Sequence, residues 1–549
     1  MLNICKFNYK NIKNSKKMIQ QNDILSASEL LTIKEASIWA SNYLNKTVTS
    51  SNIAYLIQYG RISKLNENGN TFISKKELTE YYEKYNRANV WKKKLGDDLN
   101  WALSFEEYKE SETTKHVHRL HPYKGKFIPQ LVEYFLDDHI DNFKKELFFK
   151  KGDIVLDPFA GNGTTVVQAN ELGINAIGID VSEFNSFISN SKIEKYDLFD
   201  LQLNIKGITK LIETYIQEAH YIEFEKELLL ELNKFNTEFF PVPEYKNNLL
   251  KGMINENIYG AEKEEEFLRI YNFLLEKYEI NLENGQNEGY LNKWYFPHVI
   301  KEIRIVFDRI KEIKNIKTKK IISLILSRTM RSCRATKHAD LATLVEPISS
   351  TYYCSKHGKI CKPLFSIIKW WKTYSVDTIN RIIQFEKYRT NTYQRCFVGD
   401  SRNVNIFTLV EKNDPAFYSI LQRQKIAGIF TSPPYVGLID YHEQHAYAYE
   451  LFGFKRNDEL EIGALYKGQG KEARTSYVEG IAEVLNNCKQ YLADNYNVFL
   501  VANDKYNLYP LIAEKVGMEI VNQYKRPVLN RSEKDKAAYS EIIFHLKQK

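Results

Sequence analysis

Two short segments, each directly after an apolar run, combine residue types that could bind a ligand and act on it. The first reads DPFAGNGTT from Asp157 onward and follows the apolar residues IVL. Its glycines Gly161 and Gly163 let the backbone approach a ligand closely, and the helix expected to begin at Thr164 can hold a carboxylate through free N–H groups. Phosphate loops and dinucleotide folds use the same device, so the turn alone does not identify the ligand.

Two further details favour a nucleoside over a triphosphate. The glycines are not followed by the lysine of a G-x-x-x-x-G-K-[ST] loop, which would be placed for a triphosphate. Asp180 ends the next apolar run, NAIGID. A carboxylate at this position can accept both ribose hydroxyls. The sequence therefore predicts a nucleoside site with no obvious need for a pyrophosphate.

The second segment is TSPPY, directly after the apolar run IAGIF. Pro433 and Pro434 prevent helix formation and remove two backbone donors, so that carbonyl groups project from the strand end. A base amino group flipped out of a duplex offers two N–H donors, which a backbone carbonyl and the Ser432 hydroxyl could accept while the Tyr435 ring stacks on the base. The alternative is an ordinary Pro-Pro turn with a surface tyrosine, and the location after a buried strand disfavours it.

Strands and helices that alternate along the chain must position these loops. Strands are expected over residues 154–157, 175–180, 396–400, 426–431, 497–502, 518–524 and 541–546, with helices over 164–173 and 476–492. This alternation is typical of a doubly wound α/β sheet. The alternation of strands and helices stops over residues 186–392, which instead contain helical segments rich in Leu, Ile, Lys and Glu. A structureless loop of that length is improbable, so we expect a mainly helical inserted domain.

Residues 27–87 predict a small module that precedes the sheet. We expect a helix in SASELLTIKEASIWAS, a second helix capped by Ser51, a strand from Thr71 to Ile73 and a closing helix from Ser74. This order resembles the winged helix-turn-helix modules of the excisionase and MerR type, which implies DNA contact. A packing unit without a nucleic-acid role is the alternative. Residues 1–26 form an N-terminal extension and residues 88–115 a connector.

The composition is that of a soluble globular protein with several domains. Of 549 residues, 43% are hydrophobic and 27% charged, and 77 Lys and Arg against 69 Asp and Glu give a net charge of +8. This charge favours a polyanionic partner without proving one. There is no apolar run that could span a bilayer and no secretory signal, and the six cysteines are scattered without a disulfide pattern. We therefore expect a cytoplasmic location and no membrane partner.

Four motifs together resemble the amino-directed DNA methyltransferases of site-specific restriction-modification type. DPFAGNGTT and TSPPY resemble their cofactor loop and catalytic tetrapeptide. HPYKGKF, from His121 to Phe127, resembles the HPYxxKF form of the helix that borders the methionine end of the cofactor, and FVGDSR contains Asp400, which approaches the adenine in this family. The resemblance covers about residues 115–185 and 393–549. It implies a Rossmann-like sheet of seven strands, in parts 116–185 and 393–549 around the insertion.

The resemblance also implies a reaction and its residues. A methyl group passes from S-adenosylmethionine to an exocyclic amino group of a flipped-out base in duplex DNA, with catalytic residues Ser432, Pro433, Pro434 and Tyr435. The cofactor-binding residues that it implies are Tyr123, Lys126, Phe127, Asp157, Phe159, Ala160, Gly161, Gly163, Thr164, Thr165, Asp180, Asp400 and Thr431. Hydrogen-bond acceptors for the amino group would localise its lone pair and stabilise the developing charge. None of the cysteines lies in the Pro-Cys turn that a covalent route at cytosine C5 uses.

The target base follows from one residue. An SPPY tetrapeptide is associated mostly with cytosine N4, whereas adenine N6 enzymes usually carry Asp or Asn in place of Ser432. Cytosine N4 is the expected target and adenine N6 the nearest alternative. An amino methyltransferase for RNA or a protein glutamine is a further alternative, which the helix-turn-helix-like start and the basic insertion disfavour. A DNA-binding regulator with an inactive methyltransferase domain is another, which the intact motifs disfavour. The recognition sequence, the oligomeric state and the presence of a separate cognate restriction endonuclease cannot be predicted.

The insertion contains candidate metal ligands. Cys354, His357 and Cys361 form a C-x2-H-x3-C cluster, and Cys333 or His338 could complete a tetrahedral structural zinc site. Reduced cysteines packed as small hydrophobes are the slightly favoured alternative. After the catalytic tetrapeptide, His442 and His445 lack the flanking ligands of zinc helices, so structural or substrate-edge roles are expected for them.

Basic and aromatic residues also gather in the insertion, which suits a surface that follows the DNA backbone and reads bases. We therefore assign target recognition mainly to this region. The residues concerned are Arg328, Arg331, Arg334, Lys337, Lys356, Lys359, Lys362, Tyr352, Tyr353, Trp370 and Trp371.

Overall fold

The computed structural model describes residues 30–44, 47–58, 61–67, 70–84, 95, 99–218, 221–282, 288–338, 340, 344–528 and 539–549. The chain forms two compact units, one from residues 1–89 with 235–260 and one from residues 90–234 with 261–549. The predicted extension 1–26 lies outside the described residues, as does most of the connector before residue 99. Among the described residues, no helix is both long and apolar enough to cross a membrane.

The N-terminal part of the first unit has the predicted order of helix, helix, hairpin and helix. Its elements are β1 (Leu30–Thr32), α2 (Ile33–Tyr43), α3 (Ser50–Gln58), β2 (Leu65–Glu67), β3 (Asn70–Ser74) and α4 (Lys75–Lys84). The strands form an antiparallel sheet in the order β1-β3-β2. Ile53, Leu56 and Ile57 of α3 are buried, as the pattern predicts, and contribute to a core with Ala36 and Ile73.

Two helix starts in this module differ from the prediction. Helix α2 begins after Thr32, whose hydroxyl accepts from Glu35 N at 3.2 Å while the Glu35 carboxylate accepts from Thr32 N at 2.9 Å. This capping box ends strand β1, so the helix does not extend back to the serines. At α3, the cap is Thr49 and not Ser51, because the Thr49 hydroxyl accepts from Asn52 N at 3.2 Å.

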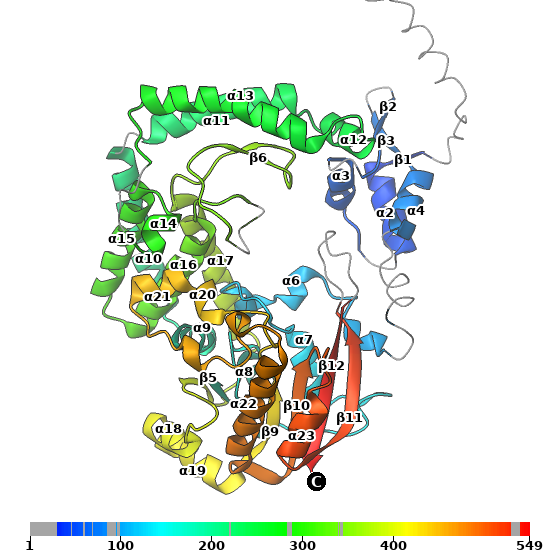
Figure 1. Cartoon of the computed structure of the whole chain (residues 1–549), viewed down its shortest axis with the longest axis vertical. Coiled ribbons are helices and arrows are strands. Elements are labelled where there is room, and N and C mark those ends of the chain that lie inside the picture. The colour runs from blue at the N-terminus through cyan, green and yellow to red at the C-terminus, as the bar shows by residue number, and fades with distance from the viewer. Residues whose placement is uncertain are drawn as a thin grey trace, which may run out of the picture. The chain divides into compact units, whose positions relative to one another are not determined.

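The second unit is built on one mixed sheet of seven strands in the order β11-β12-β10-β9-β4-β5-β8 (Figure 1). The strands are β4 (Ile154–Asp157), β5 (Asn175–Asp180), β8 (Gln394–Val398), β9 (Ile426–Thr431), β10 (Leu492–Ala502), β11 (Met518–Pro527) and β12 (Ser540–Gln548). All seven predicted strands are therefore present. The pairs from β8 to β10 are parallel, and β12 runs antiparallel to both of its neighbours.

Alternating residues of the central strands pack on opposite faces of this sheet. In β4, Ile154 and Leu156 belong to one core cluster and Val155 to the other. Helices α18 (Ile406–Asn413), α19 (Pro415–Gln424), α22 (Lys471–Lys489) and α23 (Tyr509–Lys515) contribute to the first cluster, whereas α7 (Pro129–Leu136) and α8 (Thr164–Glu171) contribute to the second. Helices on both faces of a mostly parallel sheet make a doubly wound α/β fold.

The segment between β5 and β8 is mainly helical, as predicted. It contains α9 (Glu183–Ile193), α10 (Leu198–Glu218), α11 (Tyr221–Phe239), α12 (Glu244–Leu250), α13 (Glu256–Lys277), α14 (Tyr290–Trp294), α15 (Pro297–Glu312), α16 (Ile316–Ser332), a hairpin of β6 (Tyr352–Cys354) and β7 (Lys359–Cys361), and α17 (Ile368–Glu386). Helix α16 is central: it packs on α15, α17, α10 and α9. Most of this segment therefore belongs to the same compact unit as the sheet.

Candidate active site

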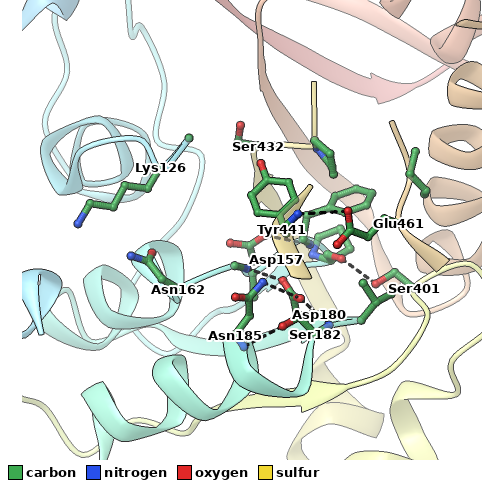
Figure 2. Close-up of a pocket in the computed structure, with 18 of the residues that line it drawn as sticks. Lys126, Asp157, Asn162, Asp180, Ser182, Asn185, Ser401, Ser432, Tyr441 and Glu461 are labelled. Atoms are coloured by element: carbon green, nitrogen blue, oxygen red, sulfur yellow. Dashed lines mark hydrogen bonds between the residues drawn. The ribbon is translucent and has the colours of Figure 1, made fainter. Parts of the chain in front are cut away.

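A pocket lies where β4, β5, β8 and β9 end at their carboxyl edge, the edge at which parallel α/β sheets bind ligands (Figure 2). Of the residues that the sequence assigned to the cofactor or to catalysis, those that line it are Tyr123, Lys126, Phe127, Asp157, Phe159, Ala160, Gly161, Thr164, Asp180, Asp400, Ser432 and Pro434. The structure thus brings all four sequence motifs to one pocket. Gly163, Thr165, Thr431, Pro433 and Tyr435 are not among its lining residues.

The glycine loop between β4 and α8 requires its glycines for two different reasons. Gly161 and Gly163 have positive φ angles of +48° and +77°, which favour glycine. A Cβ on Gly163 would also lie 2.2 Å from Ser189 Oγ of α9. Helix α8 begins at Thr164, as predicted, so its N-terminus opens toward the pocket.

Asp157 ends β4 and is buried against the neighbouring strand. Burial raises the pKa of its carboxyl to about 6, although a hydrogen bond from Thr431 lowers it. Thr431 ends β9 and donates to Asp157 Oδ1 at 2.5 Å, and Phe159 N donates to the same oxygen at 3.2 Å. Thr431 therefore binds the Asp157 carboxylate without itself lining the pocket.

Asp180 ends β5, the strand next to β4, and lines the pocket beside the glycine loop. Its carboxylate accepts from Gly161 N and Ser182 N, both at 2.8 Å, and from Asn185 Nδ2 at 3.1 Å. Burial raises the pKa of this carboxyl. The Gly161 N–H group connects Asp180 to the glycine loop, and Ser182 and Asn185 connect it to the start of α9, so that the end of β5 and the glycine loop form one wall (Figure 2).

Ser432 and Tyr435 of the tetrapeptide lie in different surroundings. Ser432 lines the pocket, and its hydroxyl donates to the Val501 carbonyl of β10 at 3.1 Å. Its oxygen is thereby left as an acceptor. Tyr435 packs on the core, its hydroxyl donates to Glu541 of β12 at 2.9 Å, and burial raises its pKa. Stacking of Tyr435 on a base stays a prediction.

Aromatic and basic residues of the HPYKGKF segment close another side. The Tyr123 ring stacks on Tyr441 at 5.7 Å between centroids, and its hydroxyl accepts from Asn185 Nδ2 at 3.2 Å. Lys126 Nζ donates to the His118 carbonyl at 2.9 Å, and burial lowers its pKa to about 8.

Asp400 lines the pocket but already has a partner. Its carboxylate accepts from Arg402 Nε at 2.9 Å and from Arg402 Nη2 at 2.7 Å. Because Arg402 already balances its charge, the Asp400 carboxylate would attract a charged ligand only weakly. We expect it to shape the pocket wall and to accept hydrogen bonds at its remaining lone pairs.

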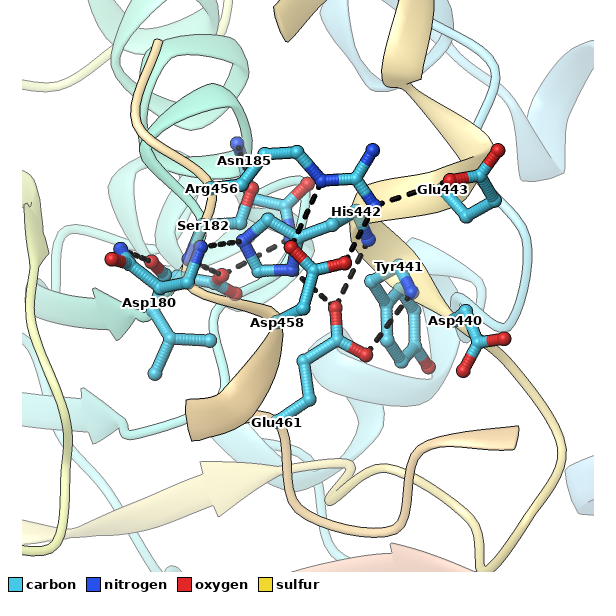
Figure 3. Close-up of polar contacts among 12 residues, drawn as sticks. Asp180, Ser182, Asn185, Asp440, Tyr441, His442, Glu443, Arg456, Asp458 and Glu461 are labelled. Atoms are coloured by element: carbon cyan, nitrogen blue, oxygen red, sulfur yellow. Dashed lines mark hydrogen bonds and ion pairs between the residues drawn. The ribbon is translucent and has the colours of Figure 1, made fainter. Parts of the chain in front are cut away.

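Outside the four motifs, sequence reasoning missed three polar residues that line the pocket: Ser182, Asn185 and Glu461. Ser182 caps α9 by accepting from Asn185 N at 3.1 Å, and a serine two residues after Asp180 is the signal that could have revealed it. Glu461 lies outside any motif. It accepts from the backbone N–H groups of Tyr441 and His442 at 3.3 and 3.0 Å, and from the His442 ring (Figure 3).

These contacts give His442 a structural role. His442 is buried between Glu461 and Asn457, whose N–H donates to His442 Nε2 at 3.2 Å. His445 is buried as well, and burial lowers its pKa to about 3. Nearby, Arg456 binds Asp458 and Glu443 (Figure 3). The segment after the tetrapeptide is thus fixed by ion pairs and hydrogen bonds, and of the structural and substrate-edge roles expected for this histidine pair the contacts of His442 are structural.

Several of the basic and aromatic residues assigned to target recognition have partners inside the unit. Arg328 pairs with Asp377 at 2.5 Å and Lys362 with Glu225 at 2.5 Å. Trp371 is fully buried and donates to Thr209 at 2.9 Å. Arg331 differs, because no carboxylate of the described chain lies within ion-pair distance of it. Burial, with a further contribution from Arg334, lowers its pKa.

Four of the candidate metal ligands lie close together in the structure. His338, Cys354, His357 and Cys361 place ligand atoms within 4.8 Å of one another. Cys333 does not belong to this group: it caps the end of α16 and is buried elsewhere, so His338 is the fourth member.

Comparison with known proteins identifies the class. A family model described as a DNA methylase, of the N6/N4 methyltransferases, matches residues 3–190. The chain is 45% identical over 531 residues, 96% of its own length and 98% of the relative's, to Type II methyltransferase M.MjaII of Methanocaldococcus jannaschii. Type II methyltransferase M.BsoBI of Geobacillus stearothermophilus is 34% identical over 111 residues, 20% of each chain. The chain therefore belongs to the amino-directed DNA methyltransferases of type II restriction-modification systems.

This family uses S-adenosylmethionine, as the motifs implied. A shorter similarity extends to an RNA enzyme: the tRNA (guanine(10)-N2)-dimethyltransferase of Methanocaldococcus jannaschii is 34% identical over 84 residues, 15% of this chain and 20% of that protein.

Proposed function

We propose that this enzyme transfers a methyl group from S-adenosylmethionine to the N4 amino group of a cytosine flipped out of duplex DNA. The observation that carries this proposal is the orientation of Ser432. Because its hydroxyl proton points to the Val501 carbonyl, its oxygen presents lone pairs to the pocket and can accept an amino N–H.

The pocket residues fit the cofactor. Two buried polar atoms of its walls, Asn162 Nδ2 and Asn185 Oδ1, have no hydrogen-bond partner among the described residues. Buried polar groups are rarely left unpaired, so a polar ligand is expected to satisfy them. Asp180 would hold the ribose hydroxyls, and the glycine loop with the α8 N-terminus would hold the methionine carboxylate.

The tetrapeptide would prepare the amino group. The bound cofactor supplies an electrophilic sulfonium methyl group. The Ser432 oxygen and a backbone carbonyl before Pro434 would accept the two amino hydrogens, which localises the nitrogen lone pair and stabilises positive charge developing there. No covalent bond to the protein forms, and the amino proton leaves to water after transfer.

DNA binding is proposed for two parts of the chain, the helical segment 186–392, which contains Arg331, and the module of residues 27–87. Burial lowers the pKa of Lys124 in the HPYKGKF segment, and the nearby Arg331 lowers it further. The Arg331 guanidinium has no carboxylate partner among the described residues, which suits a phosphate beside the flipped base. The helical segment 186–392 would read the target sequence, and the module of residues 27–87 would add winged helix-turn-helix contacts. A cognate endonuclease would act separately on the same site.

Adenine N6 is the nearest competing target, because its amino group offers the same two donors. The serine of SPPY favours cytosine as the target. The local similarity to a tRNA enzyme keeps RNA as a further acceptor to be tested.

Nucleoside mass spectrometry of DNA from cells expressing the enzyme tests the proposal. N4-methylcytosine should accumulate with wild-type protein and with Ser419→Ala, a change at an exposed serine of α19. It should fall at least a hundredfold with Ser432→Ala, since loss of one oriented acceptor costs about 3 kcal/mol. N6-methyladenine without N4-methylcytosine would overturn the choice of base, and methylation of tRNA but not duplex DNA would overturn the choice of acceptor.

A further inference from the structure

The β6–β7 hairpin and the chain after α16 gather four ligands whose spacing matches a tetrahedral metal site. His357 Nδ1 lies 3.5 Å from Cys354 Sγ and 3.4 Å from Cys361 Sγ. Zinc bonds of about 2.3 Å to sulfur and about 2.0 Å to nitrogen place such atoms roughly 3.5 Å apart at tetrahedral angles. The two contacts are therefore the edges expected of a zinc tetrahedron.

The fourth ligand, His338, is oriented by a neighbour. Its Nδ1 lies 2.7 Å from the Tyr352 hydroxyl, which also accepts from His338 N at 2.9 Å. A metal-bound histidine commonly uses its other ring nitrogen in such a hydrogen bond, which fixes the ring and its tautomer. Tyr352 thereby leaves Nε2 of His338 for the metal, and the His338 and His357 rings lie 4.6 Å apart between centroids.

The hairpin has a small apolar core of its own. Among the described residues, its buried cluster contains Tyr352, Cys354 and Cys361, with Ile348 packed against it, and Ile360 of β7 is buried as well. Two strands of three residues are not stable alone, and structural metals supply folding free energy in such small elements.

Polar contacts then fix the hairpin on α13. Tyr353 N donates to Glu264 at 2.8 Å, and the Tyr271 hydroxyl donates to the Ser349 carbonyl at 2.8 Å. A metal at the hairpin would therefore also keep α13 and the end of α16 in a fixed relation.

A second group of possible metal ligands is less suited to bind a metal ion. Among the described residues, His116, His118 and Glu171 also lie within 4.8 Å of one another. Glu171 already binds Lys115 Nζ at 2.6 Å and His116 Nε2 at 2.8 Å, and a cation in direct contact with the carboxylate disfavours a metal ion there.

We propose that His338, Cys354, His357 and Cys361 bind one zinc ion as a closed structural site. Four protein ligands leave no position for substrate, so the ion stabilises the hairpin and takes no part in methyl transfer. The metal joins two hairpin strands to the segment that follows α16, and α16 is the helix that contains Arg331.

Metal analysis of the full-length protein, purified without chelators from zinc-supplemented cells, tests this site. Mass spectrometry of the metal content should give about one zinc per chain, and the Cys354→Ser, Cys361→Ser double variant should lose it. Cys333→Ser is the matched control, because it removes a buried cysteine outside the group and should keep the metal. No stoichiometric zinc in the wild type, or full retention in the double variant, would overturn the proposal.

Cobalt substitution distinguishes lost ligands from lost folding. Wild-type protein exchanged with Co²⁺ should show the visible bands of a tetrahedral ion and sulfur-to-cobalt charge transfer at two thiolates, and the Cys333→Ser spectrum should be the same. A spectrum of octahedral cobalt without thiolate bands, or a Cys354–Cys361 disulfide in the freshly purified protein, would contradict a zinc site made of these residues.

Discussion

The hydroxyl of Thr431 donates a 2.5 Å hydrogen bond to the Asp157 carboxylate, although the two residues lie 274 positions apart in the sequence. The bond connects the ends of two adjacent strands, β4 with the glycine loop and β9 with the tetrapeptide. The loop that we assign to the cofactor and the loop that we assign to the base therefore share one buried contact.

Replacing Thr431 by Val should weaken this connection at little cost in volume. Loss of a hydrogen bond to a charged buried group is expected to lower the free energy of unfolding by about 1.5 to 3 kcal/mol at pH 7.5. Thr329→Val is the control, since Thr329 is buried and donates only to the Ile325 carbonyl of its own helix. Urea titration of both variants measures the difference, and equal losses would show that the Asp157 contact has no special contribution.

Ionisation of Asp157 should make the ligand-free enzyme pH-dependent. Its pKa in the folded protein, about 6, lies above its value in an unfolded chain, about 4, so the stability due to the protonated form is lost as the pH rises through 6. Relative to Asp157→Asn, the wild type should lose on the order of 1 to 2 kcal/mol between pH 5 and pH 7.5. Urea titrations at the two pH values check this, and parallel pH profiles of the two proteins would contradict it.

Asp157→Asn should weaken the binding of S-adenosylmethionine at neutral pH and remove its pH dependence. If the ionised carboxylate is the form that binds, affinity for S-adenosylmethionine in the wild type should rise about tenfold from pH 5 to pH 7, because a pKa of about 6 leaves a tenth of the carboxyl ionised at pH 5. Calorimetry should show this rise in the wild type and its absence in Asp157→Asn. An unchanged pH dependence in the variant would assign the effect to another group.

Gly163→Ala should destabilise the loop far more than a matched glycine substitution. Gly152 has a similar φ of +87° but no atom within 4 Å of an added Cβ, whereas the Cβ on Gly163 would lie 2.2 Å from Ser189 Oγ. We expect Gly152→Ala to cost about 1 to 2 kcal/mol from backbone strain alone and Gly163→Ala several kcal/mol. Thermal unfolding checks both, and Ser189→Gly should partly rescue Gly163→Ala but not Gly152→Ala.

Arg331→Ala should weaken DNA binding without weakening cofactor binding. One lost phosphate contact is expected to reduce the slope of log affinity against log salt by about 0.9. Arg309→Ala is the control, because Arg309 is exposed and already pairs with Glu312. Fluorescence anisotropy with a labelled duplex at several salt concentrations measures the slope. A slope unchanged from the wild type would remove Arg331 from the DNA interface.

Residues at strand ends could be predicted because their position follows from local pattern. Asp157, Asp180 and Thr431 each end an apolar run that is a strand in the structure, and parallel strands bring such ends together. Glu461 could not be predicted, because it reaches the pocket through a loop and is held there by His442, a tertiary contact. The orientation of the Tyr435 side chain could not be predicted either, because it depends on a hydrogen bond to Glu541 of β12.

The insertion shows the same division between local and tertiary information. The composition predicted the helical content of the insertion, and the spacing of Cys354, His357 and Cys361 predicted three of the four clustered metal ligands. The choice of His338 over Cys333 depends on how the chain leaves α16, which no local pattern specifies. Pairing of Arg328 and Lys362 with acids on other helices also follows only from packing.

The division of the sheet by the helical segment has a consequence for the order in which the protein can fold. Tyr393, directly before β8, donates a hydrogen bond to the Asn175 side chain at the start of β5, 218 positions earlier. Strands β4 and β5 leave the ribosome early and pair with each other, but their outer neighbours β9 and β8 are synthesised only after the helices between β5 and β8. Because such distant pairings form slowly, the newly made cofactor loop should stay unstructured until late in synthesis, when β8 and β9 emerge and enclose it.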